Sequence, residues 1–245
     1  MNRVLTREIL DDLPVDDVQA IRSRRDLQRV HRAMGTRTIL LRALRGMHAL
    51  RNRAAPLRVL ELGAGDGSLM LGVARELAPQ WPPVRLTLLD AQPLVPPSSI
   101  ERFAELGWTA HCTVMDAFEW ARELHGLDRH SHQEQHWDLI ITNLFLHHFE
   151  RSQLAGLLST IAARCDRFLA CEPRRAWLAL LGSHLVGALG ANAVTRCDAV
   201  LSVHAGFCGN ELSVLWTGVD GAWRVREYSA GLFSHCFVAE PTEAL

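Results

Sequence analysis

A chain of 245 residues with 48% apolar residues is long enough for one large domain with a sizeable core, or for one domain with an extension. The formal net charge of −1 excludes a bulk field that would attract nucleic acid or an anionic membrane, and the basic residues, all arginines, are scattered along the chain. The charged start lacks a signal-peptide pattern and no apolar run reaches the length of a membrane span, so we expect a cytoplasmic protein with no membrane span.

The N-terminal 55 residues predict a helical cap. Apolar positions recur at helical spacing over residues 15–34 and again over 36–50, before Pro56 breaks the pattern. We expect this cap, residues 1–55, to pack over the mouth of a main domain that spans residues 56–245. The pattern leaves open whether the cap only covers the sheet or acts as a lid over a substrate.

From residue 57 onward, strand and helix patterns alternate. Strands are predicted at 58–63, 84–90, 109–115, 138–144, 167–171, 222–229 and 232–239, and helices at 67–80, 100–106, 117–125, 150–164, 176–190 and about 197–217. This order predicts an α/β protein with a Rossmann-like, doubly wound seven-stranded sheet and an N-terminal helical cap. The glycine turn at 229–231 predicts that the last strand is antiparallel. A ligand should bind at the carboxyl ends of the strands.

The most informative segment, residues 59–69, reads VLELGAGDGSL. A strand that breaks into a glycine turn at the start of a helix brings backbone N–H groups close to a ligand. The glycines are spaced G-x-G-x-G, and Ser68 stands where a dinucleotide site would need glycine. The carboxylates of Glu61 and Asp66 favour an ammonium or sulfonium group over a pyrophosphate. The segment resembles motif I of class I S-adenosylmethionine-dependent methyltransferases.

This resemblance implies that S-adenosylmethionine is the cofactor and that other strand ends bind it. Asp90 can accept both ribose hydroxyls, although an Asp there can also be a turn former or a helix cap. Asp116 would accept from the adenine amino group, although it can also cap the helix at 117. The backbone near Asn143 would meet the methionyl amine. The implied cofactor-binding residues are Glu61, Gly63, Ala64, Gly65, Asp90, Ala91, Asp116, Ala117, Asn143 and Leu144.

The segment after the fourth strand, NLFLHHF at 143–149, is similar to the post-strand motif of ubiquinone/menaquinone-type small-molecule methyltransferases. A weakly acidic hydroxyl acceptor benefits from a base with a pKa near neutral, which favours histidine. We therefore predict His148, and after it His147, as the catalytic base. The alternative is that both histidines are packed loop residues.

Four more residues, with His148, are predicted to bind the acceptor. They are Glu172, Arg175, His204 and His235. Glu172 can equally form a structural ion pair, and core or surface positions would explain the two histidines. The segments ACEPRR, at 170–175, and 196–216 resemble bacterial methyltransferases that act beside polyketide synthases. The apolar stretch 177–190 would suit either an apolar acceptor or core packing.

These observations predict methyl transfer from S-adenosylmethionine to a small organic acceptor. The favoured target is the oxygen of a phenolic, quinone-precursor or polyketide-type metabolite of secondary metabolism. The alternatives are C-methylation of a similar aromatic acceptor, a non-catalytic cofactor-binding protein, a nicotinamide-dependent oxidoreductase and a macromolecular acceptor. The absence of a D/N-P-P-Y/F motif at 143–146 counts against a nucleic-acid acceptor. No metal is predicted, because the six cysteines lack ligand spacing and are expected to be buried free thiols. Oligomeric state, including a homodimer, is left open.

Overall fold

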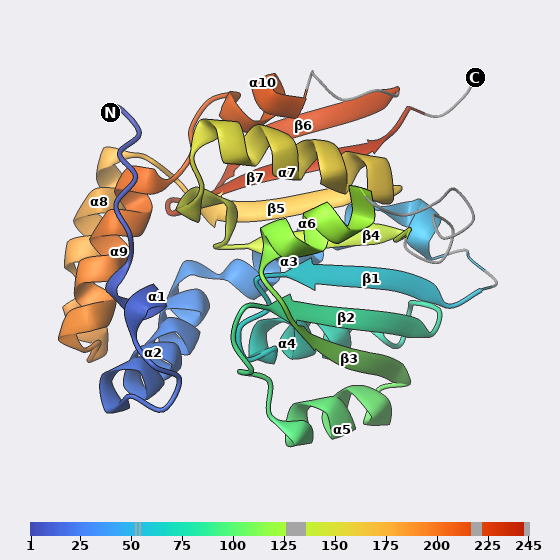
Figure 1. The fold of residues 1–245 in the computed structure, drawn as a ribbon, viewed down its shortest axis with the longest axis horizontal. Helices are drawn as coiled ribbons and strands as arrows, with labels where there is room; N and C mark the ends of the chain where they lie inside the picture. Colours follow the sequence, from blue (N-terminus) through green and yellow to red (C-terminus); the bar gives the residue numbers. More distant parts are fainter. Residues whose placement is uncertain (52, 54, 126–135, 217–221, 243–245) are drawn as a thin grey trace.

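The computed structural model describes residues 1–51, 53, 55–125, 136–216 and 222–242 (Figure 1). Its centre is a seven-stranded sheet with the strand order β3-β2-β1-β4-β5-β7-β6. The strands are β1 (Leu57–Leu62), β2 (Val84–Asp90), β3 (Trp108–Val114), β4 (Leu139–Asn143), β5 (Phe168–Pro173), β6 (Trp223–Ala230) and β7 (Ser234–Pro241). Neighbouring strands are parallel except β7, which is antiparallel to both β5 and β6. The predicted doubly wound sheet with an antiparallel last strand is confirmed.

The central strands are apolar along their whole length because helices cover both faces of the sheet. All five residues of β4 are buried, whereas β3, at the edge of the sheet, exposes alternate positions such as Thr109 and His111. The helices α3 (Thr36–Gly46), α4 (Ser68–Leu77) and α5 (Pro97–Glu105) cover one face, and α6 (Ala117–His125), α7 (Arg151–Arg164) and α10 (Glu211–Trp216) cover the other.

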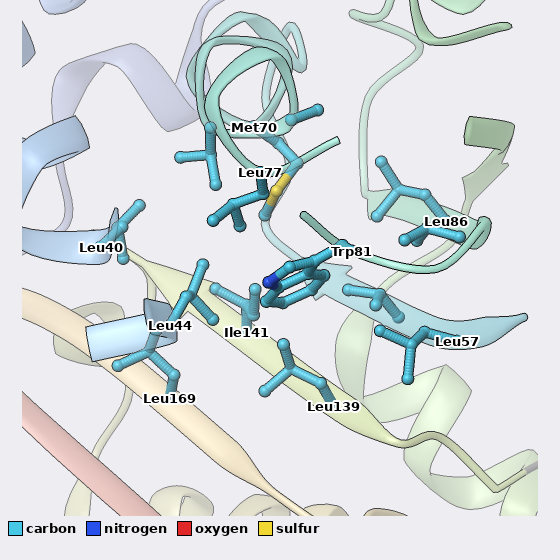
Figure 2. Close-up of a cluster of buried hydrophobic side chains, with 14 of the residues drawn as sticks. Leu40, Leu44, Leu57, Met70, Leu77, Trp81, Leu86, Leu139, Ile141 and Leu169 are labelled. Carbon is cyan, nitrogen blue, oxygen red and sulfur yellow. The ribbon is translucent and has the colours of Figure 1, made fainter. Parts of the chain in front are cut away.

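Helix α3 belongs to the core of the main domain, although the sequence prediction placed it in the cap. Figure 2 shows Leu40 and Leu44 of α3 among side chains of α4, β4 and β5. Both leucines are buried against the sheet, together with Ile141 and Leu169. An amphipathic helix pattern reports that one face is buried, but it does not identify the surface that buries it.

The remaining helices form a separate layer. They are α1 (Ile9–Asp12), α2 (Val18–Met34), α8 (Trp177–His184) and α9 (Ala193–Ala205), with the short 3-10 helix η3 (Val186–Leu189). Two further 3-10 helices, η1 (His48–Leu50) and η2 (Leu146–His148), lie in the segments before β1 and after β4. Helix α9 packs against α1, α2 and α8. This layer lies at the left of Figure 1, beyond the carboxyl ends of β1 and β2.

Buried hydrogen bonds join the N-terminal helices to α9. Asp198 accepts from the backbone N–H groups of Ile9 (2.8 Å) and Leu10 (3.0 Å). Asp26 of α2 accepts from the Asn192 N–H (2.7 Å) at the start of α9. The cap therefore combines the N-terminus with residues 177–205, which the predicted boundary at 55/56 had separated.

Two sequence expectations concern membrane-spanning helices and thiols. Within the described ranges, no helix has both the length and the apolarity that crossing a bilayer requires. All six cysteines are free. Cys165, Cys171 and Cys236 are buried as expected, whereas Cys112 and Cys197 are exposed, Cys112 because it lies on the edge strand β3.

Candidate cofactor and acceptor site

The glycine turn after β1 requires glycine for two reasons. Gly63, Gly65 and Gly67 have φ angles of 71°, 56° and 70°, in the left-handed region that favours glycine. A Cβ at Gly63 would also lie 2.4 Å from Cδ2 of Phe145. The turn and the loop after β4 thus pack against each other at the carboxyl edge of the sheet, and Ala64 lies between the first two glycines.

Asp90, at the end of β2, holds this turn in place. Its Oδ2 accepts from the Gly65 N–H (2.8 Å) and its Oδ1 accepts from the Gln92 N–H (3.0 Å). Burial raises the pKa of Asp90, although these two hydrogen bonds oppose that rise. Each carboxylate oxygen retains a further acceptor site. Ala91, the next residue, is exposed.

Glu61 is a buried carboxyl group with an unpartnered oxygen. It is 3% exposed, and its Oε2 has no hydrogen-bond partner among the described residues. Burial, together with the negative charges of Asp90 and Asp66, raises the pKa of Glu61 to about 8. Asp66 is already engaged, since it accepts from the Ser68 N–H (2.9 Å) and from the Gln28 carboxamide (2.6 Å).

Asn143, at the end of the adjacent strand β4, has a second unpartnered acceptor. It is buried, and within the described part of the chain its Oδ1 accepts no hydrogen bond. Leu144 follows with φ 50°, a left-handed conformation that costs a non-glycine residue about 1–3 kcal/mol. The hydrogen bond from its N–H to the Cys171 carbonyl (2.9 Å) helps to hold it there.

Asp116 acts as a helix cap in this structure. Its Oδ1 accepts from the backbone N–H groups of Phe118 (2.8 Å) and Glu119 (3.2 Å) at the start of α6. Asp116 is exposed, whereas Ala117 is buried. This capping role was the alternative to the adenine contact.

Glu172 holds the loop after β4. It is fully buried, and its carboxylate accepts from the N–H groups of Phe145 (3.1 Å) and Leu146 (3.0 Å) and pairs with Nδ1 of His147 (2.9 Å). These contacts occupy both oxygens. In this geometry Glu172 positions the loop through the structural pairing that the sequence had left open, and its contact with the acceptor stays a prediction.

His147 lies between two carboxylates. Its Nδ1 faces Glu172, and its Nε2 lies 3.2 Å from Oε1 of Glu8. Burial opposes the charged ring, but the hydrogen bonds to Glu172 and Glu8 outweigh it and raise the pKa of His147 to about 9. A ring that is protonated at neutral pH cannot accept a proton, so this geometry does not favour His147 as a general base.

His148 is the more accessible of the two histidines. Its side chain is 23% exposed and its Nδ1 lies 3.1 Å from Oδ2 of Asp11. Glu8, His147 and His148 place possible metal-ligand atoms within 4.8 Å of one another. The protonated His147 lies between Glu8 and Glu172 and offsets their negative charges, so these contacts are stabilising without a bound metal ion.

Arg175 and His235 have partners in other parts of the fold. Arg175 donates to the carbonyls of Met1 (3.0 Å) and Gly206 (2.7 Å) and pairs with Glu211. His235 is buried on β7, where its Nε2 lies 2.8 Å from Oε1 of Glu227. These contacts give Arg175 a structural role, and the buried position of His235 is the alternative that the sequence had left open. Contact of either residue with the acceptor stays a prediction.

His204 lies in the last turn of α9, and its carbonyl accepts from the Val4 N–H (3.1 Å).

The N-terminal strap, defined here as residues 1–13, is the part of the site that the sequence did not reveal. Arg3 donates to the carbonyls of His147 (3.0 Å) and Phe149 (2.9 Å), while Glu8 and Asp11 face the two histidines. These contacts join positions up to 146 residues apart, so no local pattern could have indicated them.

The sequence matches no protein-family model, and no curated protein matches it. Several solved structures are similar to this chain in fold. The plantazolicin methyltransferase BpumL, in complex with SAH, shares 13% identity at a TM-score of 0.60, over 93% of this chain and 92% of BpumL. The chain has the class I methyltransferase fold. Magnesium protoporphyrin IX methyltransferase from Synechocystis PCC 6803, with bound SAH, shares 15% identity at a TM-score of 0.52, over 86% of this chain and 83% of that one. An O-methyltransferase family protein from Burkholderia thailandensis shares 14% identity at a TM-score of 0.51, over 86% of this chain and 59% of that protein.

Proposed function

We propose that this protein is an S-adenosylmethionine-dependent methyltransferase that acts on a small organic acceptor. The observation that carries the proposal is the pair of unpartnered buried acceptors, Oε2 of Glu61 and Oδ1 of Asn143, at the ends of two adjacent strands. Buried polar atoms are nearly always hydrogen-bonded, so two such acceptors near the carboxyl ends of adjacent strands indicate a ligand that brings donors. Two similar solved structures, BpumL and magnesium protoporphyrin IX methyltransferase, contain SAH and SAM respectively, which supports the same cofactor here.

The residues present fit this cofactor. The ammonium group of its methionyl end would supply donors to Glu61 and Asn143 and would favour the ionised form of Glu61. Asp90 keeps two acceptor sites for the ribose hydroxyls while it holds the glycine turn. Asp116, with one oxygen engaged at the start of α6, and the Ala117 N–H remain the proposed adenine contacts.

When bound, the cofactor supplies an electrophilic methyl group, and the protein supplies alignment and exclusion of water. The loop at 144–149, held by Glu172, would face the acceptor. His148 is the base that we propose for removing the proton from an acceptor hydroxyl as the oxygen gains the methyl group.

Calorimetric titration tests the cofactor first. S-adenosylmethionine and S-adenosylhomocysteine should bind in the micromolar range, whereas NADH and NADPH should not bind. The variants Glu61→Gln and Asn143→Ala should each weaken binding, and the exposed Glu105→Gln on α5 is the matched control. Binding of a nicotinamide cofactor, or unchanged affinity in both site variants, would contradict the proposal.

The acceptor is tested by methylation assays with phenols, quinone precursors and aromatic polyketides, with mass spectrometry to separate O- from C-methylated products. Loss of turnover in His148→Gln, with cofactor affinity kept, supports the oxygen target and the base. Turnover on an aromatic carbon would favour the C-methylation alternative. Cofactor binding without turnover on any acceptor, small or macromolecular, would favour a non-catalytic member of the fold.

A further inference from the structure

Helix α8 and the 3-10 helix η3 expose a row of large apolar side chains. Trp177 is 69% exposed, Leu181 52%, Leu185 60% and Leu189 43%. The four-residue spacing places Trp177, Leu181 and Leu185 along one side of α8 and its C-terminal cap, and Leu189 follows at the end of η3. In Figure 1, α8 lies at the outer edge of the molecule, where no described element covers it on that side.

The turn between β6 and β7 extends this surface. Phe233 packs so closely against α8 that a Cβ at Gly182 would lie 2.5 Å from its Cε1. The neighbouring Leu232 is 54% exposed. We call Trp177, Leu181, Leu185, Leu189 and Leu232 the α8 patch. Monomeric proteins seldom expose contiguous apolar side chains of this size without a binding role.

Arginines surround the α8 patch. Arg174 donates to the Gly231 carbonyl (3.4 Å), beside Leu232. Arg29 donates to the Leu189 carbonyl (3.0 Å), although it also pairs with Asp26. The side chain of Arg196 lies next to Gly187, since a Cβ there would be 3.3 Å from its Nε.

The segment that carries the patch has no negative charge of its own. No Asp or Glu occurs between Glu172 and Asp198. Of the three arginines in that stretch, Arg174 and Arg196 lie at the patch, whereas Arg175 is buried and pairs with Glu211. The net charge of −1 for the whole chain therefore conceals a local positive border around an apolar surface. A partner that fits this surface is apolar inside and negatively charged at its edge.

We propose that the α8 patch attaches the protein to the surface of an anionic lipid bilayer. The leucines would enter the boundary between head groups and acyl chains, Trp177 would lie at the level of the head groups, and the arginines would meet lipid phosphates. Self-association through the same patch is disfavoured, because two copies would bring their arginine borders together. This proposal does not depend on the methyltransferase activity.

Co-sedimentation of the full chain with lipid vesicles tests the proposal. The protein should bind vesicles that contain about 30% phosphatidylglycerol, should bind pure phosphatidylcholine far less, and should be released as salt rises. The double variant Leu181→Gln/Leu185→Gln should weaken binding at least about tenfold. Arg174→Gln/Arg196→Gln should weaken it severalfold and reduce the dependence on salt.

The control variant is Val18→Gln, because Val18 is 80% exposed at the start of α2 and its substitution should leave vesicle binding unchanged. Circular dichroism melts establish that each variant is folded. On binding, the emission of Trp177 should shift to shorter wavelength, and Trp177→Phe should remove that shift. Absence of binding to anionic vesicles, or equal binding by the wild type and the double leucine variant, would overturn the proposal. Dimerisation in sedimentation velocity that the leucine variant abolishes, without vesicle binding, would overturn it in favour of self-association.

Discussion

Replacing Glu172 with Gln should destabilise the loop after β4 more than any other conservative change in the site. The carboxylate accepts from the N–H groups of Phe145 and Leu146 and pairs with His147. A carboxamide keeps one acceptor oxygen but turns an NH₂ group toward these donors. A buried N–H that loses its partner costs about 1–3 kcal/mol.

The charge on His147 sets the second part of the loss. The pKa rise from 6.5 to about 9 corresponds to roughly 3 kcal/mol of stabilisation, shared between Glu172 and Glu8. With half of this assigned to Glu172, the two terms give a loss of about 2.5–4.5 kcal/mol for Glu172→Gln, close to the cost typical of breaking a buried pair. The melting temperature should fall by roughly 10 °C.

Urea denaturation measures this loss, and NMR titration of the histidine ring measures the pKa of His147. Glu8→Gln is the matched control, because it removes the partner of Nε2 and leaves the backbone contacts of Glu172 intact. It should cost only about 1–2 kcal/mol. A Glu172→Gln protein within about 1 kcal/mol of the wild type, with an unchanged His147 titration, would refute this account of the loop.

The same pair predicts a dependence on pH. The pKa of His147 is higher in the folded protein than in the unfolded chain, so its contribution is fully present below pH 6.5 and is lost as pH rises through about 9. His147 should therefore lower the free energy of unfolding of the wild type by up to roughly 3 kcal/mol across this window, in addition to the loss from Glu61 below about pH 8. The fall should be much smaller in Glu172→Gln, and an equal fall in both proteins would assign it to another group.

Three further changes test the glycine turn and its neighbours. Gly63→Ala should destabilise the protein by about 2 kcal/mol more than Gly65→Ala in urea denaturation. Both glycines have positive φ, but only at Gly63 would an added Cβ clash with Phe145. Equal losses in the two variants would show that this clash does not matter. Glu61→Gln should stabilise the protein at pH 8 but not at pH 4.5. Burial raises the pKa of Glu61 from 4.5 to about 8, so the wild type loses stability as pH rises between these values. An equal gain in the free energy of unfolding at both pH values would contradict the shift. Asp90→Ala should weaken cofactor binding by ~1–3 kcal/mol in calorimetry, through two lost hydrogen bonds to a charged acceptor; unchanged affinity would contradict the proposed ribose contact.

The fold could be predicted because its signals are local. Apolar periodicity located each strand of the sheet to within about two residues, and the turn at 229–231 indicated the antiparallel pair. The glycines at 63 and 65 pointed to the carboxyl edge, where the structure places Glu61, Asp90 and Asn143 together. Parallel strands bring their carboxyl ends to one edge, so strand order in the sequence was sufficient for this placement.

Only the tertiary structure decided what those side chains do. Glu172 contacts the loop that ends 23 residues before it, and Glu8 contacts His147, 139 residues away in the sequence. Both contacts depend on tertiary packing, which the apolar periodicity of the sequence does not report. Packing likewise buried α3 in the core, joined α9 to the N-terminus and left the apolar side of α8 exposed. The sequence by itself determined the sheet and the edge that carries the site, because backbone preferences and apolar periodicity are properties of neighbouring residues. The partners of the buried charged groups were decided by the fold. Burial shifts the pKa of such a group only when segments distant in the sequence cover it.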